Sequence, residues 1–273
     1  MKKIIIFSLL IFFSLLISCS EDNPTTSGNI KKYPDSLGTE WEYGTIMIFE
    51  FYDSTAQIIE TDTLDLSNTI VKIIKTNDSL GVYKQLTLFE SYDVSSPQYK
   101  GKHWYSNTDT DLSAIAYSNA GAARFIVPKI TNRRHLTIEE LKSIINSPDQ
   151  NLISAKSESV SDTILFYDIP RKALAYPLAV NQHWVELETP WYRERYVERS
   201  ITLNFNGRFV KCYEIKVNWP DFKIEINDYV NLNIGLLRRD IIADSVLFTD
   251  PSSPDSGRFG RYYESSNLVR TNR

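Results

Sequence analysis

The chain of 273 residues carries 30 basic and 34 acidic side chains, a formal net charge of −4, and 42% of its residues are hydrophobic. A mildly acidic chain without grouped Lys and Arg lacks the charge that phosphate binding needs, so we expect no nucleic-acid partner. The two cysteines, Cys19 and Cys212, are too few for a disulfide framework. The length suffices for a substantial hydrophobic core.

The first eighteen residues have the pattern of a secretory signal. Lys2 and Lys3 precede an apolar run from Ile4 to Ile17, which is too short to span a bilayer as a helix. The run ends in Leu16-Ile17-Ser18-Cys19, which resembles the lipobox of bacterial lipoproteins. The resemblance implies cleavage before Cys19 and acylation of this cysteine. The alternative is an ordinary secreted protein in which the cysteine occurs by chance.

Acyl chains on Cys19 imply the membrane as a partner and an anchor that is not readily released. Ser20 follows the cysteine, which by analogy with Gram-negative lipoprotein sorting disfavours retention at the inner membrane. Glu21-Asp22 resembles the acidic export signals of some lipoproteins. We therefore expect a protein anchored by lipid in the outer membrane, facing the periplasm or the cell exterior. Without residues 1–18, 28 basic side chains face 34 acidic ones, a net charge of −6.

Residues 19–32 are polar after the cysteine and predict a flexible tether, and residues 33–270 predict a single β-rich domain. This domain contains one sequence motif twice, called the echo below. Tyr33-Pro34 is followed by Gly38 and Trp41, and Tyr176-Pro177 is followed at the same spacings by Asn181 and Trp184. Proline, a residue that accepts positive φ and a Trp that opens a strand together predict a corner. The echo predicts two similar halves, about 33–155 and 156–270.

The rest of the domain shows the two-residue alternation of strands. The first strand places Trp41, Tyr43, Met47, Phe49 and Phe51 on one face. Asn206-Gly207 predicts a hairpin, and Gly235 predicts a bend within a strand. Strands are predicted at 69–75, 82–89 (after a turn at 76–81), 101–105, 112–118, 123–127, 163–167, 192–205, 208–219, 222–227, 231–248 and 259–269.

One helix is predicted, at residues 137–145. Thr137 and Glu140 form a capping-box pattern, and Ile138, Leu141 and Ile145 form an apolar stripe. The fold class is therefore mainly β, an antiparallel and strongly curved sheet, either a half-barrel or a sandwich, with one short satellite helix.

A second resemblance covers residues 176–269. The order is the Tyr176-Pro177-Leu178 corner ending in Trp184, a hairpin closing on Gly207-Arg208-Phe209, and the segment 233–239, Asn-Ile-Gly-Leu-Leu-Arg-Arg. It is similar to uncharacterised β-rich envelope lipoproteins, although Asn181 stands where such proteins usually have Gly. The resemblance implies a curved antiparallel sheet and brings no activity with it.

The sequence offers no catalytic constellation, no cofactor motif and no metal-ligand spacing. His103, His135 and His183 stand apart from other ligands, and His103 and His183 are predicted to face solvent. Residues 107–111 have calcium-loop oxygens but lack the Gly and the closing Glu, so a polar hairpin turn is predicted. Cys212 is interpreted as a small hydrophobic residue on the less apolar face of its strand. Arg193, Arg195 and Arg199 alternate with acids and predict a mixed-charge strand face.

Aromatic side chains are the one candidate for a binding surface, since a curved sheet lined with them suits a glycan or an acyl chain. The alternative is that Tyr simply packs well on half-buried sheets. The candidates are Trp104, Tyr105, Trp191, Tyr192, Tyr196, Tyr213, Tyr262 and Tyr263.

These observations predict a binding or scaffold module whose partner is a glycan, a lipid or an envelope protein. The first alternative is a glycan hydrolase with two carboxylates that the sequence does not identify. The second is a half-barrel lipid carrier, which requires an uncovered apolar concave face.

Overall fold

The computed structural model describes residues 30–98, 100–120, 137–138, 140–141, 164–188, 192–219, 224–248 and 257–272. The signal, Cys19 and most of the tether lie outside these residues. Thirteen strands are described: β1 (Glu40–Tyr52), β2 (Ile58–Asp65), β3 (Thr69–Leu80), β4 (Tyr83–Asp93), β5 (Lys100–Asn107), β6 (Asp111–Ala120), β7 (Ile164–Ala175), β8 (His183–Leu187), β9 (Arg193–Phe205), β10 (Arg208–Asn218), β11 (Ile224–Asn231), β12 (Gly235–Leu247) and β13 (Phe259–Thr271).

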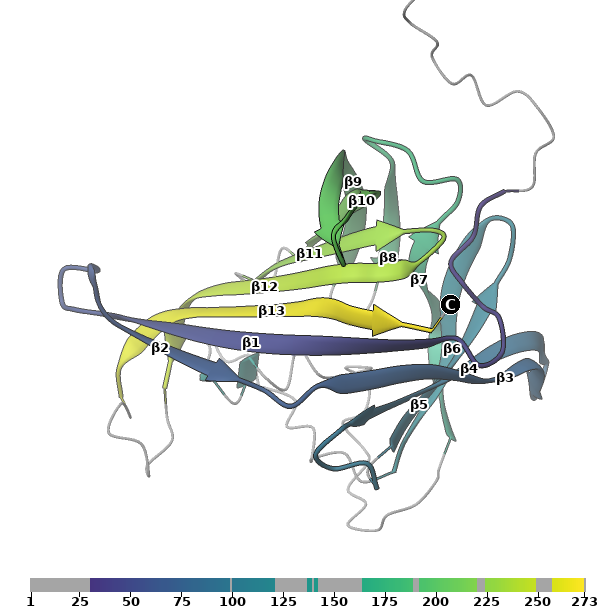
Figure 1. Ribbon diagram of the computed structural model, residues 1–273, viewed down its shortest axis with the longest axis horizontal. Helices are drawn as coiled ribbons and strands as arrows, with labels where there is room; N and C mark the ends of the chain where they lie inside the picture. Colours follow the sequence, from purple (N-terminus) through teal and green to yellow (C-terminus); the bar gives the residue numbers. More distant parts are fainter. Residues whose placement is uncertain are drawn as a thin grey trace, which may run out of the picture. The chain divides into compact units, whose positions relative to one another are not determined.

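The strands form one antiparallel sheet in which neighbours in sequence are mostly neighbours in space. The order is β7-β6-β5-β4-β3-β1-β13-β12-β11-β10-β9-β8, and β2 pairs with the far part of β1. The first and last strands, β1 and β13, therefore lie side by side in the middle (Figure 1). β3 to β7 extend the sheet on one side of this pair, and β12 to β8 extend it on the other.

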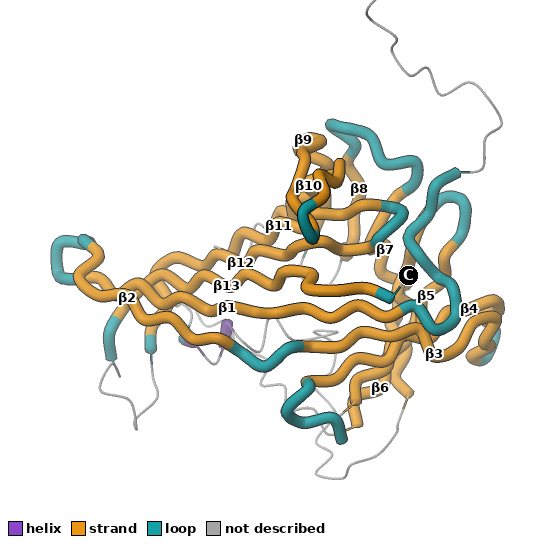
Figure 2. The backbone as a smooth tube through the Cα atoms, in the orientation of Figure 1, coloured by secondary structure: helices purple, strands orange, loops and turns teal. Residues whose placement is uncertain are grey.

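The sheet curls so strongly that its two end strands meet. The indole Nε1 of Trp184 on β8 donates a hydrogen bond of 3.0 Å to the carbonyl of Lys172 on β7. This curvature makes a half-barrel that is nearly closed, as the backbone trace shows in Figure 2. The predicted fold class is thereby confirmed as a half-barrel rather than a sandwich.

The two corner sequences form the same turn twice. Gly38 and Asn181 both adopt positive φ, +82° and +68°, which Gly and Asn tolerate better than other residues. Each turn exchanges two backbone hydrogen bonds with a fully buried residue of another strand. They join Gly38 N to Ile73 O (2.9 Å) and Ile73 N to Thr39 O (2.9 Å), and likewise Asn181 N to Val197 O (2.8 Å) and Val197 N to Gln182 O (2.9 Å).

The two turns also contact each other. The backbone N of Tyr33 donates to the hydroxyl of Tyr176 at 2.9 Å, and that hydroxyl donates to Asn107 Oδ1 at 3.1 Å. Asn107 Nδ2 in turn donates a hydrogen bond of 2.9 Å to the carbonyl of Tyr33. The sequence echo is thus a structural repeat whose two copies meet at one end of the sheet.

The concave face of the sheet, called the inner face below, is the one that carries Trp41, Tyr43 and Met47. Trp41 is fully buried, stacks on Phe89 with ring centroids 6.0 Å apart, and donates from Nε1 to the carbonyl of Ile234 at 2.6 Å. Toward the other end of β1, Met47 packs in a cluster with six buried side chains from strands and loops and with Ile138 and Leu141. Hydrophobic clusters therefore occupy both ends of the inner face.

The predicted helix is described only at its start. Thr137 and Glu140 form the predicted capping box: Glu140 N donates to Thr137 Oγ1 at 3.1 Å, and Thr137 N donates to Glu140 Oε2 at 2.9 Å. Ile138 and Leu141 are buried against the inner face. The remainder of the predicted helix, to residue 145, lies outside the described residues. No helix among the described residues has the length and apolarity needed to cross a bilayer.

Several boundaries differ from the sequence prediction. The predicted turn at 76–81 instead forms the end of β3, and the chain reverses at Gly81 and Val82. Asn77 adopts φ of +54°, and the pairing of β3 with β4 shifts register around it, so β3 continues past this residue. β2 was missed because its side chains are exposed throughout and its polar residues obscure the alternation. The strand predicted at 123–127 lies outside the described residues. The hairpin at Asn206 and Gly207 is confirmed, with both residues at positive φ.

Candidate functional site

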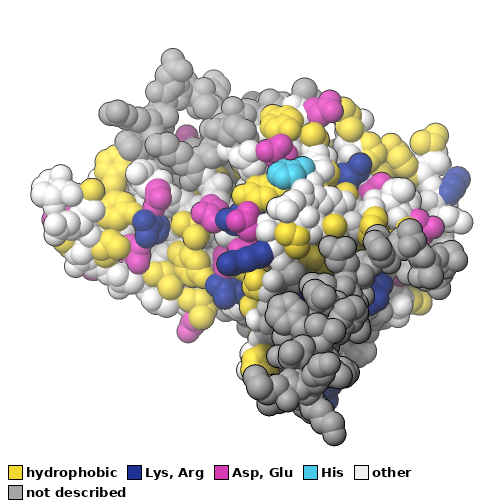
Figure 3. All heavy atoms as spheres, turned by 90° about the horizontal axis from the view of Figure 1, so that it is seen from above, with side chains coloured by type: hydrophobic (Ala, Val, Ile, Leu, Met, Phe, Trp, Pro, Cys, Tyr) yellow, Lys and Arg dark blue, Asp and Glu magenta, His cyan; other side chains and the backbone are white. Residues whose placement is uncertain are grey.

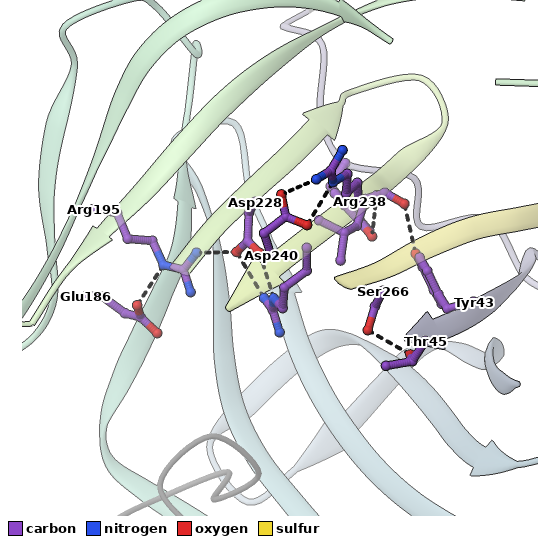
Figure 4. Close-up of polar contacts among 11 residues, drawn as sticks. Tyr43, Thr45, Glu186, Arg195, Asp228, Arg238, Asp240 and Ser266 are labelled. Carbon is purple, nitrogen blue, oxygen red and sulfur yellow. Dashed lines mark hydrogen bonds and ion pairs between the residues drawn. The ribbon is translucent and has the colours of Figure 1, made fainter. Parts of the chain in front are cut away.

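The most unusual feature of the inner face is a chain of five charged side chains. Arg195 on β9 donates from Nε to Glu186 Oε2 at 2.6 Å and from Nη1 to Asp228 Oδ2 at 2.7 Å (Figure 4). Arg193 donates to the other oxygen of Glu186 at 2.6 Å. Arg239 binds Asp228 through two nitrogens, at 2.6 and 2.9 Å. The order Arg193, Glu186, Arg195, Asp228, Arg239 is called the charged chain below.

Strand pairing explains why these residues meet. Trp184 opposes Arg195 between β8 and β9, which brings Glu186 beside the same strand. Val197 on β9 opposes Ile215 on β10, which in turn opposes Asp228 on β11. Asp228 then opposes Arg239 on β12. Residues 186 to 239 thus reach one side of the sheet through four successive pairings.

The charged chain lies between hydrophobic residues of the inner face. Arg239 stands between Leu237 and Ile241 on the same side of β12, and these two belong to the clusters of Trp41 and Met47. Glu186 and Asp228 side chains are only 6% and 5% exposed. The guanidinium of Arg193 also lies 4.9 Å from the ring of Trp219. A buried charge is tolerated only when it is paired, and here every carboxylate is paired with two arginines.

The pairing decides the protonation of both acids. Burial by itself raises the pKa of Glu186, but Arg193 and Arg195 outweigh it and hold that pKa at about 2. Burial opposes ionisation of Asp228 in the same way, and Arg239 and Arg195 lower its pKa well below the ordinary value. The pKa of Arg239 is raised, chiefly by Asp228. All five groups are therefore ionised at neutral pH.

Three further inner-face groups lie close to the charged chain. Arg171 on β7 is buried with its guanidinium 4.7 Å from the ring of Tyr167, and its charge helps to lower the pKa of Glu186. Burial raises the pKa of Tyr105, while Arg239 and Arg195 act in the opposite direction. His103 lies beside Tyr117, with ring centroids 6.2 Å apart. The prediction that His103 faces solvent is wrong, because the face opposite Trp104 is the concave one.

We expect His103 to make stability depend on pH. Burial, with a smaller effect of Arg171, lowers its pKa from 6.5 to about 4. Between these values the unfolded chain binds a proton that the folded chain does not, so stability falls as pH decreases through this window. The loss from pH 7 to pH 5 is about 1–2 kcal/mol in urea unfolding. His103→Gln should remove this contribution to the pH dependence of stability, whereas His183→Gln should retain it. An NMR titration that gives His103 a pKa near 6.5 contradicts the prediction.

The structure does not bring the predicted aromatic residues together in one surface. Tyr105, Tyr213 and Tyr262 lie on the inner face, where Tyr262 is fully buried beside Ile138 and Leu141. Others lie on the outer face or at the surface. Trp104 is buried under the β3–β4 hairpin, Tyr196 stacks on His183, Tyr263 bonds Asp240, Tyr192 is exposed, and Trp191 lies outside the described residues.

The outer face carries charge pairs of a more ordinary kind. Arg199 binds Glu214 at 2.5 Å, Arg238 binds Asp240 at 2.7 Å, and Arg261 binds Asp244 at 2.7 Å. Each of these arginines is at least one-third exposed. On the face drawn in Figure 3, basic and acidic side chains likewise lie next to one another among hydrophobic ones. Of the arginines predicted to form a mixed-charge face, Arg193 and Arg195 are instead on the inner face.

Other candidates for chemistry find no support in the described part of the chain. Cys212 is buried, and burial followed by Glu214 raises its pKa to about 11, so it is a thiol and not a nucleophile at neutral pH. No three His, Cys, Asp or Glu side chains of the described segments come together as metal ligands. The 107–111 segment forms the predicted polar turn, in which Thr108 and Thr110 bond Asp111.

An open hollow of about 610 Å³ lies at the ends of β10 and β11 and includes Tyr196, Lys216 and Trp219 in its lining. The residues that connect these two strands, 220–223, lie outside the described segments. The charged chain is the better candidate site, because its geometry is complete within the residues that the structure describes.

Comparisons with known proteins show no family for this chain. No family model and no curated protein matches the chain. Among solved structures, a putative lipoprotein from Parabacteroides distasonis ATCC 8503 matches at 11% identity and a TM-score of 0.32, over 90% of this chain and all of the other. A putative exported protein with a YmcC-like fold from Bacteroides fragilis NCTC 9343 matches at 11% identity and a TM-score of 0.34, over 89% and 100%. We therefore argue function from the residues of this chain.

Proposed function

We propose that the protein is a lipid-anchored cell-envelope protein whose β-sheet body binds a ligand at its inner face. The charged chain carries this proposal. Replacing buried ion pairs by hydrophobic residues of similar size is often neutral or stabilising, so fold stability does not by itself account for the four buried charges of this chain, Arg193, Glu186, Arg195 and Asp228. Buried charges with strongly perturbed pKa values, grouped on the concave side of a curved sheet, are typical of a binding site.

The two alternative functions are less well supported by the same residues. A glycan hydrolase needs a carboxylic acid that holds a proton at working pH. Glu186 and Asp228 both contact Arg195, but their lowered pKa values keep both ionised, so this pair offers no general acid. A lipid carrier needs an open apolar concave face. The described inner face instead carries packed side-chain clusters at both ends, and the charged chain lies between them.

The anchor is tested with an alkyne analogue of palmitate fed to bacteria that express the full chain. We expect the protein to be labelled and to fractionate with the outer membrane. Cys19→Ser should abolish the label, because the acyl chains need this sulfur and the amine that cleavage exposes. Cys212→Ser is the matched control and should keep it. A label that survives Cys19→Ser contradicts the anchor.

The binding role is tested on the full chain in detergent with a panel of small molecules that includes anions, sugars and acyl chains. We expect at least one class to raise the melting temperature and to slow hydrogen exchange in β8, β9, β11 and β12, which carry the charged chain. A panel in which no class changes either quantity contradicts a binding role at this face.

A further inference from the structure

We infer that the inner face binds a monocarboxylate, held by Arg239 together with the hydroxyl of Tyr105. This inference rests on the proposed function and names the class of ligand. It is drawn from the charge of the charged chain, from the donors that its residues leave unused, and from the side chains that surround Arg239.

The charge balance comes first. Three arginines, Arg193, Arg195 and Arg239, face two carboxylates, Glu186 and Asp228, so positive charge is in excess in the charged chain, and buried Arg171 lies close to it. An uncompensated charge in a hydrophobic interior costs free energy, which a bound monoanion removes. The excess of positive charge therefore favours a bound anion.

The unused donors show where this anion binds. Arg239 gives Nε and Nη2 to Asp228, and its Nη1 makes no hydrogen bond to any residue that the structure describes. Its side chain remains 40% exposed, whereas that of Arg195 is 11% exposed. Arg239 is thus the member of the charged chain that a solute can reach. A guanidinium edge is well matched to the two oxygens of a carboxylate.

Tyr105 supplies the second donor. Tyr105 is half-buried on the inner face, and its hydroxyl makes no hydrogen bond within the described segments. Tyr105 packs against the hydrophobic cluster that contains Leu237, the neighbour of Arg239 on the same side of β12, and Arg239 acts to lower the pKa of Tyr105. A neutral phenol at this position can donate its proton to a carboxylate oxygen that Arg239 also binds.

The surroundings predict that the rest of the ligand is apolar. Phe89 contacts Tyr105 edge to face with ring centroids 5.0 Å apart, and Trp41 stacks on Phe89. These rings belong to the hydrophobic cluster at the corner end of the inner face. A carboxylate with an aromatic or aliphatic body should therefore bind more tightly than acetate.

The experiment measures binding of benzoate, acetate, benzamide and inorganic phosphate to the full chain in detergent, by calorimetry at constant ionic strength. We expect benzoate to bind one to one, at least tenfold more tightly than benzamide, and more tightly than acetate or phosphate. Arg239→Gln should weaken benzoate at least tenfold. Arg238→Gln is the matched control, because the adjacent arginine binds Asp240 on the outer face, and it should change the affinity less than twofold.

Tyr105→Phe provides a variant that leaves every ion pair intact, and it decides the question if Arg239→Gln fails to fold by circular dichroism. We expect it to weaken benzoate three- to tenfold and to leave the unfolding midpoint nearly unchanged. Equal affinity for benzoate and benzamide, tighter binding of phosphate, or equal effects of the Arg238 and Arg239 variants overturns the inference. If sugars or acyl chains bind at this face while benzoate does not, the inference fails and the proposed binding role stands.

Discussion

Arg195→Met should destabilise the protein by about 3–5 kcal/mol at neutral pH, because it removes the one cation that both buried carboxylates share. Glu186 would keep only Arg193, and Asp228 would keep only Arg239. Methionine preserves much of the side-chain volume, so the loss reports charge more than packing. The measurement is the free energy of unfolding in urea, obtained at several pH values.

The pH dependence separates this mechanism from a simple packing defect. In the wild type, the lowered pKa values of Glu186 and Asp228 contribute stability that is present above their ordinary values and is lost as pH falls from about 4.5 toward 2. In the Arg195 variant these pKa values lie closer to ordinary ones, so the difference from wild type should shrink in acid. A difference that stays constant from pH 7 to pH 3 contradicts the prediction.

Arg261→Met is the matched control for the charge effect. Arg261 binds Asp244 at the same 2.7 Å as the Arg195 contact to Asp228, but its side chain and that of Asp244 are 42% and 54% exposed. Exposed ion pairs contribute about 0–1 kcal/mol, so this variant should lose no more than that. Equal losses for Arg195 and Arg261 would show that the buried network has no special energetic role.

Trp41→Ala should cost about 3–5 kcal/mol, the range seen when a fully buried aromatic side chain is truncated in a core. The ring is enclosed by Tyr33 and Phe89, and its Nε1 donates to the carbonyl of Ile234. The backbone of Gly235 approaches so closely that a Cβ there would lie 2.7 Å from Nε1. Gly235 has no side chain that could move into the space left by the Trp41 ring, so the free energy of unfolding in urea should show the full cost.

The repeat provides a second, independent check. Trp184 occupies the equivalent place in the other corner and donates from Nε1 to the carbonyl of Lys172, so Trp184→Ala should cost a similar amount. Phe209→Ala is the control, because this ring is 82% exposed and its loss should change stability by less than about 0.5 kcal/mol. If Trp41→Ala is as mild as Phe209→Ala, the corner does not organise the core.

Features set by neighbouring residues were predictable from the sequence. Alternation in the segment from Trp41 to Phe51 identified a face that is buried at Trp41, Tyr43, Met47 and Phe51. Asn206-Gly207 identified its hairpin, and Thr137 with Glu140 identified the helix cap. The two Tyr-Pro corners identified the repeat. Each of these depends on backbone geometry or on contacts within a few residues, so the local pattern contains the needed information.

The charged chain could not be predicted in this way. The segment from Arg193 to Arg199 has the composition of a solvated strand face, and its alternation shows only which side chains share a face. It does not show which face another part of the sheet will cover. Glu186, Arg195, Asp228 and Arg239 meet through the pairings of five strands, β8 to β12. A bulge at Glu198 sends Arg199 to the outer face while Arg195 stays inside.

The sequence by itself therefore determined the strands, the two corners and the antiparallel, curved character of the sheet, because these follow from local backbone preferences and from two-residue periodicity. Only the tertiary structure decided that β7 and β8 meet, and hence which face is concave. That closure places Arg195 in a low-dielectric interior beside Glu186 and Asp228, with the half-buried Arg239 next to Asp228. The same side chains on an open sheet would be solvated, and their charges would carry little energetic weight.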